Sequence, residues 1–328
     1  MSKLVTIYGG SGFVGRYIAR RMAKEGWRVR VAVRRQNEAL FVKPYGVPGQ
    51  VEPVLCNIRD DASVRAVMRG ADAVVNCVGT FDRGGKNNFQ AVQAEGAGRV
   101  ARIAAEEGVA RLVHISAIGA AADAPSLYGQ SKAAGEAAVL AAFPGAVILR
   151  PSVIFGNEDG FFNKFASMAR LGPVLPLVKA ETRFQPVFVD DVAQAAVKGI
   201  TGEATPGIYE LGGPDVESFR ELIGKMLKVI QRRRLVLNMP TFLMGIVAGA
   251  LDIGSVLTGG LIRNKVLTRD QLASLGQDNV VAPGAKGLAD LGITPVAFEA
   301  VVPEYLWPFR PSGQFAAIKA SAKNLTKA

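Results

Sequence analysis

The chain is poor in the residues that build metal sites and covalent cross-links. Its 328 residues include one histidine, His114, and two cysteines, Cys56 and Cys77. A single imidazole and two separated thiols do not form the ligand cluster of a zinc site, and two cysteines do not form a disulfide framework. We therefore expect no bound metal, free buried thiols in a reducing compartment, and a histidine that serves as a core residue of an apolar strand.

Long hydrophobic runs are also missing. The most apolar stretch, residues 240–262, is interrupted at Asp252, and its uninterrupted part is only about half as long as a membrane-spanning helix. Two interpretations remain, a buried core helix or a segment that lies on a membrane surface or in a protein groove. The basic residues on both sides, over residues 232–269, favour the second interpretation, with a membrane surface or anionic lipid as the partner.

Acidic residues are outnumbered by basic ones, 28 to 39, so the net charge is +11. This excess favours anionic partners such as nucleotide phosphates, anionic lipids or acidic protein surfaces. Nucleic acid is not expected, because no recognised binding module is present and aromatic residues make up only 7% of the chain. The sequence begins directly with a predicted strand, so no signal or transit peptide is expected. The basic tail at 311–328 is predicted to be disordered in isolation.

Glycine, by contrast, is placed where a nucleotide phosphate needs it. The apolar strand Leu4–Ile7 is followed by Gly9, Gly12 and Gly15, and a helix-like run begins at Phe13. The first glycine permits a tight turn, the second lets the backbone approach phosphate, and the third lets the helix pack close to the strand. Because helix N-termini present unpaired N–H groups, the pattern predicts that a dinucleotide pyrophosphate binds there.

The second predicted strand, residues 28–33, ends in Arg34 and Arg35. A site for NAD(H) usually carries Asp or Glu at this position to bind both ribose hydroxyls, whereas arginine pairs with the 2′-phosphate of NADP(H) through its planar guanidinium group. We therefore predict NADPH or NADP+ as the cofactor. The alternative interpretation is that both arginines simply follow the strand into solvent.

Short apolar segments alternate with helix-patterned segments over the first half of the chain, which predicts an α/β fold. The expected strands are residues 3–8, 28–33, 51–55, 72–78, 111–115 and 146–150. They indicate a Rossmann-type, doubly wound parallel sheet in an NADP(H)-binding domain over residues 1–150, completed by parts of 180–215. Residues 151–310 break into short elements and are predicted to form a smaller, discontinuous C-terminal lobe with a basic, apolar docking segment.

Tyr128 and Lys132 are four residues apart and therefore share one face of a predicted helix. In short-chain dehydrogenases such a pair is catalytic: the lysine holds the nicotinamide ribose and lowers the tyrosine pKa, and the tyrosine exchanges a proton with the substrate oxygen. The hydroxyl that usually polarises the substrate carbonyl is missing, because Ala117 and Ile118 follow Ser116. Losing one such donor costs about 2–4 kcal/mol of transition-state stabilisation, so fast turnover is not expected.

The chain resembles the atypical short-chain dehydrogenase/reductase superfamily and, within it, the nucleotide-binding alpha-nine accessory subunits of respiratory complex I and their bacterial homologues. The glycine turn and the pair of Tyr128 and Lys132 are common to the superfamily. The narrower resemblance rests on the segments at 150–168, 185–192, 267–270 and 288–293. The similarity extends over most of the chain, from residue 4 to about residue 310.

This resemblance implies a tightly held, structural NADPH in a peripheral subunit on the cytoplasmic face of a bacterial inner membrane, docked near the quinone-access region of complex I. Transferred position by position, it implies nucleotide contacts at Gly9, Gly12, Phe13, Val14, Gly15, Arg34, Asn57, Ile58, Val78, Gly79, Ser116, Tyr128, Lys132, Pro151 and Ile154. The adenine-side position, Asn57, is often Asp in relatives, and its amide oxygen is expected to accept the same hydrogen bond.

Two functions from different classes stay open. The first is a non-catalytic NADP(H)-binding accessory or assembly subunit of membrane NADH:quinone oxidoreductase, which the missing hydroxyl and the basic C-terminal third favour. The second is an NADP-dependent reductase or epimerase of the short-chain dehydrogenase type that acts on a lipophilic or quinone-pathway substrate. The presence of Tyr128 and Lys132 supports this alternative.

Overall fold

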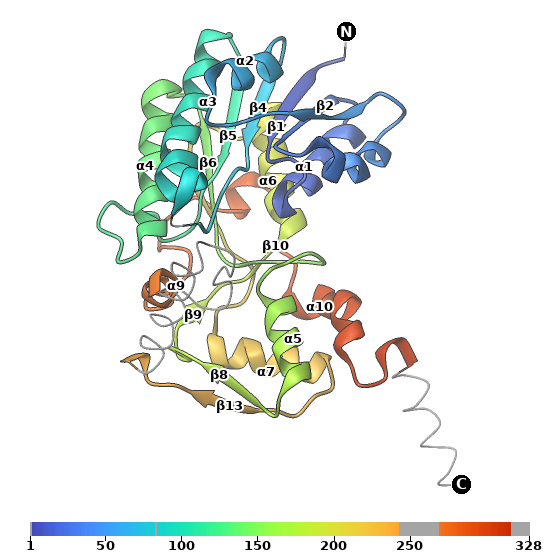
Figure 1. The fold of residues 1–328 in the computed structure, drawn as a ribbon, viewed down its shortest axis with the longest axis vertical. Coiled ribbons are helices and arrows are strands. Elements are labelled where there is room, and N and C mark those ends of the chain that lie inside the picture. Colours follow the sequence, from blue (N-terminus) through green and yellow to red (C-terminus); the bar gives the residue numbers. More distant parts are fainter. Residues whose placement is uncertain (1, 83, 243–268, 316–328) are drawn as a thin grey trace. The chain divides into compact units, whose positions relative to one another are not determined.

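The computed structural model describes residues 2–82, 84–242 and 269–315 and separates them into two compact units (Figure 1). The first unit comprises the described residues of 2–152, 189–212 and 281–295. The second comprises those of 153–188, 213–280 and 296–315. The apolar segment predicted at 240–262 lies outside the described residues from position 243 onward, and the predicted basic tail lies outside them from position 316.

A seven-stranded parallel sheet forms the centre of the first unit, in the spatial order β11-β6-β5-β4-β1-β2-β3. Its strands are β1 (Leu4–Tyr8), β2 (Arg28–Val33), β3 (Val51–Leu55), β4 (Ala73–Asn76), β5 (Arg111–Ile115), β6 (Val147–Pro151) and β11 (Gly207–Leu211). The strand order runs outward in both directions from β1 and β4, so the winding of the chain reverses between them. The predicted Rossmann-type, doubly wound α/β fold is confirmed.

Helices cover both faces of this sheet (Figure 1). One face carries α2 (Asp61–Met68), α3 (Glu95–Glu106) and α4 (Leu127–Ala142), and the other carries α1 (Phe13–Lys24) and α6 (Val189–Thr201). The shorter helical segments are η1 (Gln36–Tyr45), η2 (Gly85–Asn87), the π-helical η3 (Gln90–Ala94) and η4 (Ala289–Leu291). Every residue of β1 and β4 is buried, because strands of a parallel sheet lie between two helical layers. Their largely apolar sequences follow from this position, and the polar residues among them, Thr6 and Asn76, are buried as well.

Residues 281–295 return to the first unit late in the chain. Glu210 of β11 holds this segment through two hydrogen bonds. Its main-chain N–H donates to the Lys286 carbonyl at 2.8 Å, and its carboxylate accepts the Ala282 N–H at 2.8 Å. The sequence pattern predicts this segment in the C-terminal lobe, whereas its contacts group it with the first unit. Glu210 and Ala282 are 72 positions apart, so no local pattern reports their contact.

The second unit is built from short elements around an aromatic core. Among its described residues, strands pair as β7 (Ile154–Phe155) with β10 (Val187–Phe188), β9 (Arg183–Phe184) with β12 (Glu217–Ser218), and β8 (Val174–Leu177) with β13 (Leu235–Asn238). The helical segments are α5 (Phe162–Leu171), α7 (Phe219–Val229), α9 (Arg269–Ser274), α10 (Phe298–Leu306), η5 (Trp307–Phe309) and η6 (Gly313–Phe315). Phe155, Phe162 and Phe219 are fully buried in its core. Within the described part of the chain, no helix is both long and apolar enough to cross a membrane.

Candidate functional site

The glycine turn joins β1 to the N-terminus of α1. Gly9 has a φ of +75°, a left-handed conformation that strains other residues but not glycine. A Cβ atom added at Gly15 would lie 2.5 Å from the Gly9 carbonyl oxygen, so α1 approaches the turn more closely than a side chain allows. Gly12 directly precedes the helix, whose first N–H groups have no acceptor within the helix. The turn is therefore a positively polarised cradle suited to phosphate.

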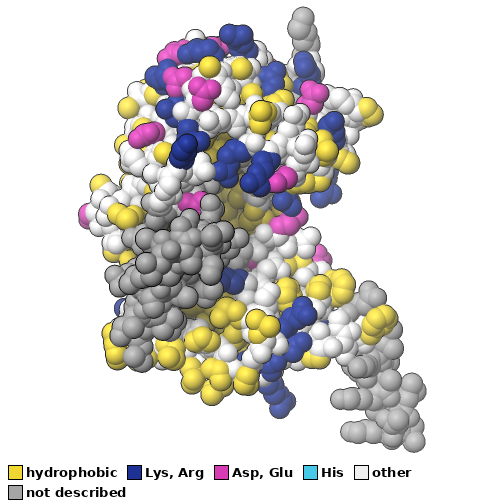
Figure 2. Space-filling model, in the orientation of Figure 1, with side chains coloured by type: hydrophobic (Ala, Val, Ile, Leu, Met, Phe, Trp, Pro, Cys, Tyr) yellow, Lys and Arg dark blue, Asp and Glu magenta, His cyan; other side chains and the backbone are white. Residues whose placement is uncertain are grey.

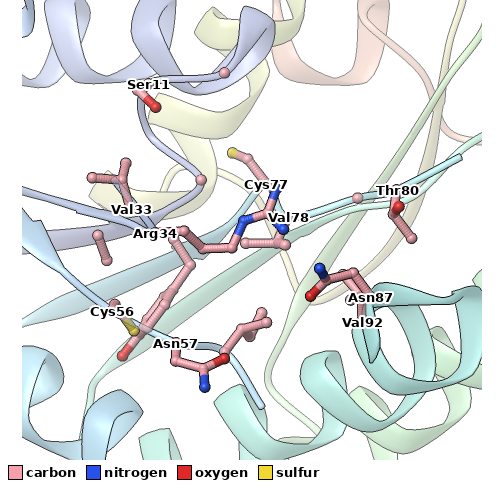
Figure 3. Close-up of a pocket in the computed structure, with 16 residues that line it drawn as sticks. Ser11, Val33, Arg34, Cys56, Asn57, Cys77, Val78, Thr80, Asn87 and Val92 are labelled. Atoms are coloured by element: carbon pink, nitrogen blue, oxygen red, sulfur yellow. The ribbon is translucent and has the colours of Figure 1, made fainter. Parts of the chain in front are cut away.

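A cavity of about 240 Å³ lies beside this turn, at the carboxyl ends of β1 to β4 (Figure 3). Its lining includes part of the predicted set, namely Gly9, Gly12, Arg34, Asn57, Ile58, Val78 and Gly79. Further lining residues, which the sequence reasoning misses, are Tyr8, Ser11, Ala32, Val33, Cys56, Cys77, Thr80, Asn87 and Val92. Most of these are neighbours of predicted residues at strand ends. The sequence could have indicated them only by their position just after predicted strands, because parallel sheets bind ligands at the carboxyl ends of the strands where the winding reverses.

Arg34 and Arg35, adjacent at the end of β2, have different surroundings. Arg34 lines the cavity, and Figure 3 shows its side chain extending across it. Arg35 is outside the lining and pairs with the exposed carboxylate of Glu38 at 2.9 Å. Successive side chains of an extended segment point in opposite directions, so one of two adjacent arginines faces the cavity and the other does not. Arg34 thus adds a planar cation to a phosphate-type cradle.

Asn57 follows β3 on another side of the same cavity. Its side-chain Oδ1 accepts the N–H of Arg59 at 3.2 Å, and its own N–H donates to Ser63 Oγ at 2.9 Å. These bonds fix the loop after β3. An amide oxygen has two lone pairs, so one remains for the adenine amine that the family resemblance implies as its partner.

Tyr128 and Lys132 lie one turn apart on α4, outside the cavity lining. The Lys132 Nζ is buried, donates to the Ile115 carbonyl at 3.1 Å, and lies 5.9 Å from the Tyr128 ring centroid. Burial lowers the pKa of Lys132 to about 8, although Glu136 and Cys77 oppose the shift. Burial raises the pKa of Tyr128 to about 12. This direction is opposite to the lowered tyrosine pKa that the dehydrogenase mechanism uses, so at neutral pH Tyr128 is a protonated phenol.

Two phenylalanines enclose the Tyr128 ring. Phe81 stacks on it with the ring centroids 5.3 Å apart, and Phe89 meets it edge-on at 6.1 Å. Phe89 is buried, whereas Phe81 is 70% exposed. The loop that carries Phe81 also forms part of the cavity wall through Thr80, whose carbonyl accepts from Gln93 Nε2 at 2.8 Å. The cavity and the face of Tyr128 are therefore bordered by one loop.

The remaining predicted contacts also lie outside the cavity lining. Phe13 and Val14, like Gly15, occupy the first turn of α1, and Pro151 ends β6, where its carbonyl accepts the Ile118 N–H at 3.0 Å. Ile154 belongs to β7 of the second unit. Ser116 follows β5, and its buried Oγ has no hydrogen-bond partner within the described residues. Buried hydroxyls are normally satisfied, so this atom fits a bound polar group at the end of β5.

His114, Cys56 and Cys77 are in surroundings that disfavour their charged forms. Burial, assisted by the charge of Lys132, lowers the pKa of His114 to about 3, and its Nδ1 lies 3.2 Å from Asn76 Nδ2. Burial raises the pKa of Cys56 to about 11 and that of Cys77 to about 12, so both free thiols are protonated at neutral pH. Over the ranges that the structure describes, no three ligating side chains are placed to hold a metal ion.

The sequence profile of the NAD dependent epimerase/dehydratase family matches residues 5–212, which is more than half of the chain and includes the glycine turn, Arg34, Tyr128 and Lys132. The chain belongs to this family. Its glycine cradle, the cation at Arg34 and the orphaned Ser116 hydroxyl fit the dinucleotide that gives the NAD dependent epimerase/dehydratase family its name.

Relatives within the NAD dependent epimerase/dehydratase family differ in their described roles. The chain is 32% identical to NADH dehydrogenase [ubiquinone] 1 alpha subcomplex subunit 9, mitochondrial, of Arabidopsis thaliana over 94% of the chain and 79% of that protein. This match confirms the narrower resemblance that the sequence motifs indicate. The chain is 34% identical to ceramide reductase of Caulobacter vibrioides over 63% of the chain and 64% of that protein.

A solved structure shows the same fold. NADPH-dependent quinone oxidoreductase QOR2 of Escherichia coli, complexed with NADPH, superposes with a TM-score of 0.70 over 92% of this chain and 98% of that one. The two sequences are 15% identical. Identity this low carries information on fold alone, and the fold is the Rossmann-like sheet with a second, smaller unit.

Proposed function

We propose that this chain is an NADP(H)-binding, non-catalytic accessory subunit of membrane NADH:quinone oxidoreductase, or complex I. The observation that carries the proposal is the 32% identity to the Arabidopsis complex I subunit over 94% of the chain. That match includes the second unit, whereas the family profile ends at residue 212. Similarity in the nucleotide-binding part alone would support nucleotide binding and nothing more specific.

The chemistry of the cavity supports NADP(H) over NAD(H). Among the described residues that line it, Arg34 is the only cationic one, and no Asp or Glu is present. A 2′-phosphate placed beside Arg34 would gain a charge-assisted pair, whereas a ribose diol would lack its usual carboxylate acceptor. Bound NADPH would supply a hydride donor. The chain's own residues would hold it: the glycine turn at the pyrophosphate and Arg34 at the adenosine end.

A structural role for the nucleotide agrees with the surroundings of the predicted catalytic pair. Tyr128 has a pKa of about 12 and is covered by Phe81, so it is poorly suited to exchange protons near neutral pH. Ala117 and Ile118 stand where a working reductase has a hydroxyl donor. A ligand that binds only the folded chain still stabilises it by mass action. The nucleotide would therefore hold the first unit in the form that assembles.

The proposed place of assembly is the region of complex I near quinone access, on the cytoplasmic face of a bacterial inner membrane. The basic C-terminal third of the chain supports a docking role, because uncompensated positive charge favours acidic protein surfaces and anionic headgroups. The subunit would be peripheral, and its partners would be the complex I subunits that surround the quinone site.

The test is native-gel analysis of gently solubilised membranes from cells that carry wild-type or variant chains. We expect the wild-type chain to co-migrate with complex I together with about one NADPH per chain, since the nucleotide is held and not turned over. Gly12→Asp, which places a carboxylate in the phosphate cradle, should deplete the assembled complex. Tyr128→Phe is the matched control and should assemble normally. A wild-type chain that migrates only as a small, separate species would contradict the proposal.

The alternative is an NADP-dependent reductase acting on a lipophilic substrate. The 34% identity to ceramide reductase and the retained Tyr128 and Lys132 favour it. The same Tyr128→Phe strain separates the two functions. Loss of a lipid or quinone product with complex I assembly intact would support the reductase, whereas an unchanged strain would support the accessory subunit.

A further inference from the structure

The small sheet formed by β8 and β13 has an apolar outer face. The strands are parallel, with Leu235 opposite Val174 and Leu237 opposite Pro176. The alternate residues, Leu175 and Val236 among them, point inward and pack in the core of the second unit. A sheet with one face on the core normally has polar residues on the face that meets water. Here both faces are apolar.

The exposure of this outer face is large. Leu235 is 60% exposed, Leu237 and Val174 are 40% exposed, and Leu171, just before β8, is 89% exposed. Figure 2 shows hydrophobic side chains gathered over the β8 and β13 region, with basic side chains beside them. Single exposed leucines are ordinary, but a contiguous apolar patch on two paired strands indicates an interaction surface.

Arginines border this face at the start of both strands. Arg232, Arg233 and Arg234 directly precede β13, and Arg170 lies four residues before β8. Because the two strands are parallel and in register, both arginine groups lie at the same end of the sheet. The surface thus has an apolar area with positive charge along one edge.

Arg232 and Arg234 are held in place by carbonyl oxygens of the main chain, and so is Arg310, which lies nearby. The bonds are Arg232 Nε to Phe309 at 2.8 Å, Arg234 Nε to Ala169 at 2.7 Å, and Arg310 Nε to Val229 at 2.9 Å. Within the described residues none of them forms an ion pair with a carboxylate. Burial lowers the pKa of Arg232, and the like charges of Arg234 and Arg170 lower it further. Over the ranges that the structure describes, no carboxylate therefore compensates the positive charge of this cluster.

We infer that the second unit binds the surface of an anionic lipid bilayer, with the outer face of β8 and β13 in the interface and the arginine edge among the headgroups. Aliphatic side chains gain free energy in the acyl region, where they form no hydrogen bonds, and arginine adds attraction to each anionic headgroup. The aliphatic area would face the acyl region of the bilayer, and the arginines beside it would lie at the level of the anionic headgroups. This inference rests on the membrane placement in the proposed function and deepens it by naming the face that binds and the class of lipid. It concerns the isolated chain, so it can be tested without complex I.

The experiment is co-sedimentation of the purified full chain with vesicles of phosphatidylcholine, alone or mixed with phosphatidylglycerol. We expect binding that needs phosphatidylglycerol and weakens at high salt. Leu235→Ser with Leu237→Ser should weaken binding, and Arg233→Glu, which reverses an exposed charge, should weaken it roughly tenfold. The controls carry equivalent changes on the first unit: Leu40→Ser with Leu55→Ser, where the two leucines are 48% and 66% exposed, and Arg20→Glu. Both controls should bind as the wild type does.

Three results would overturn the inference. These are equal binding to neutral vesicles, no vesicle binding at either composition, or equal loss in the variants and the first-unit controls. In the second case the face of β8 and β13 would be a protein-docking surface instead. Because the substituted side chains are exposed, unfolding midpoints measured in parallel should match the wild type. The test involves no complex I, so its outcome is separate from that of the native-gel experiment.

Discussion

Phe81 and Tyr128 form a stacked pair, with ring centroids 5.3 Å apart and ring planes within 16° of parallel. Phe81 is 70% exposed, so its position is not explained by burial in a core. It covers one face of the tyrosine, while Phe89 covers the edge. The pair accounts physically for the raised pKa of Tyr128, because an apolar cover disfavours the phenolate.

Removing this cover should make Tyr128 more acidic. In Phe81→Ala we expect its pKa to fall from about 12 toward the ordinary value of 10.0, because water would reach the phenol. The measurement is ultraviolet titration of the phenolate, with the same variant carrying Tyr128→Phe as the blank. Phe41→Ala is the control, since Phe41 is also exposed and contacts a different tyrosine, Tyr45, in an edge-on arrangement. An unchanged Tyr128 titration in Phe81→Ala would refute the covering role.

Exchanging the charge at Arg34 should alter cofactor preference. Arg34→Asp is expected to weaken NADPH binding by about tenfold or more, since a charge-assisted hydrogen bond is lost and repulsion is added. NADH binding should change much less, because NADH has no 2′-phosphate. Isothermal titration of both nucleotides measures this. Arg35→Asp is the control, because Arg35 lies outside the cavity and pairs with Glu38. Equal effects of the two substitutions would argue against Arg34 as the phosphate partner.

The pair of Glu136 and Arg150 should contribute to the stability of the first unit. Glu136 is only 4% exposed, and its carboxylate accepts two hydrogen bonds from Arg150 at 2.9 and 2.6 Å. Glu136→Ala leaves a partly buried cation with only a longer contact to Glu210, so we expect a loss of about 2 kcal/mol in unfolding free energy. Urea unfolding measures it. In Glu181→Ala, which breaks an exposed pair with Arg220, the loss should stay below about 0.5 kcal/mol.

The buried Lys132 should make stability depend on pH in the alkaline range. Its pKa is about 8 in the folded chain and 10.5 ordinarily, so between these values the unfolded chain binds more protons. Stability from this group therefore rises with pH across that window, by about 1 kcal/mol per pH unit. The wild type and Lys132→Met should diverge accordingly when urea unfolding is repeated from pH 8 upward. Comparing the two chains cancels the contributions of Cys56 and of the tyrosines to the pH dependence of stability, because these groups titrate in both chains. A constant difference between them would show that Lys132 is not charged and buried as described.

Local patterns predicted the Rossmann-type fold well. The strands around Leu4–Tyr8 and Arg28–Val33 lie where the apolar segments predict them. Strand formation and tight turns depend on residues within a few positions of each other, and the three glycines mark the turn directly. Among the residues that line the cavity, the local patterns single out Gly9, Gly12 and Arg34, and the family resemblance implies Asn57, Ile58, Val78 and Gly79. Neither of them indicates neighbours such as Thr80 and Asn87. Those two lie on the loop after β4, whose path depends on contacts such as Gln93 to Thr80.

By itself, the sequence determined the doubly wound sheet, the glycine cradle and the family, because these depend on short-range patterns of apolar residues and glycine. Only the tertiary structure decided which arginine enters the cavity, how Phe81 covers Tyr128, and that residues 281–295 pack with the first unit. It also decided that Val174 and Leu235, 61 positions apart, share one apolar face. Such pairings bring distant segments together, and their energies come from burial and charge in three dimensions, which no local pattern encodes.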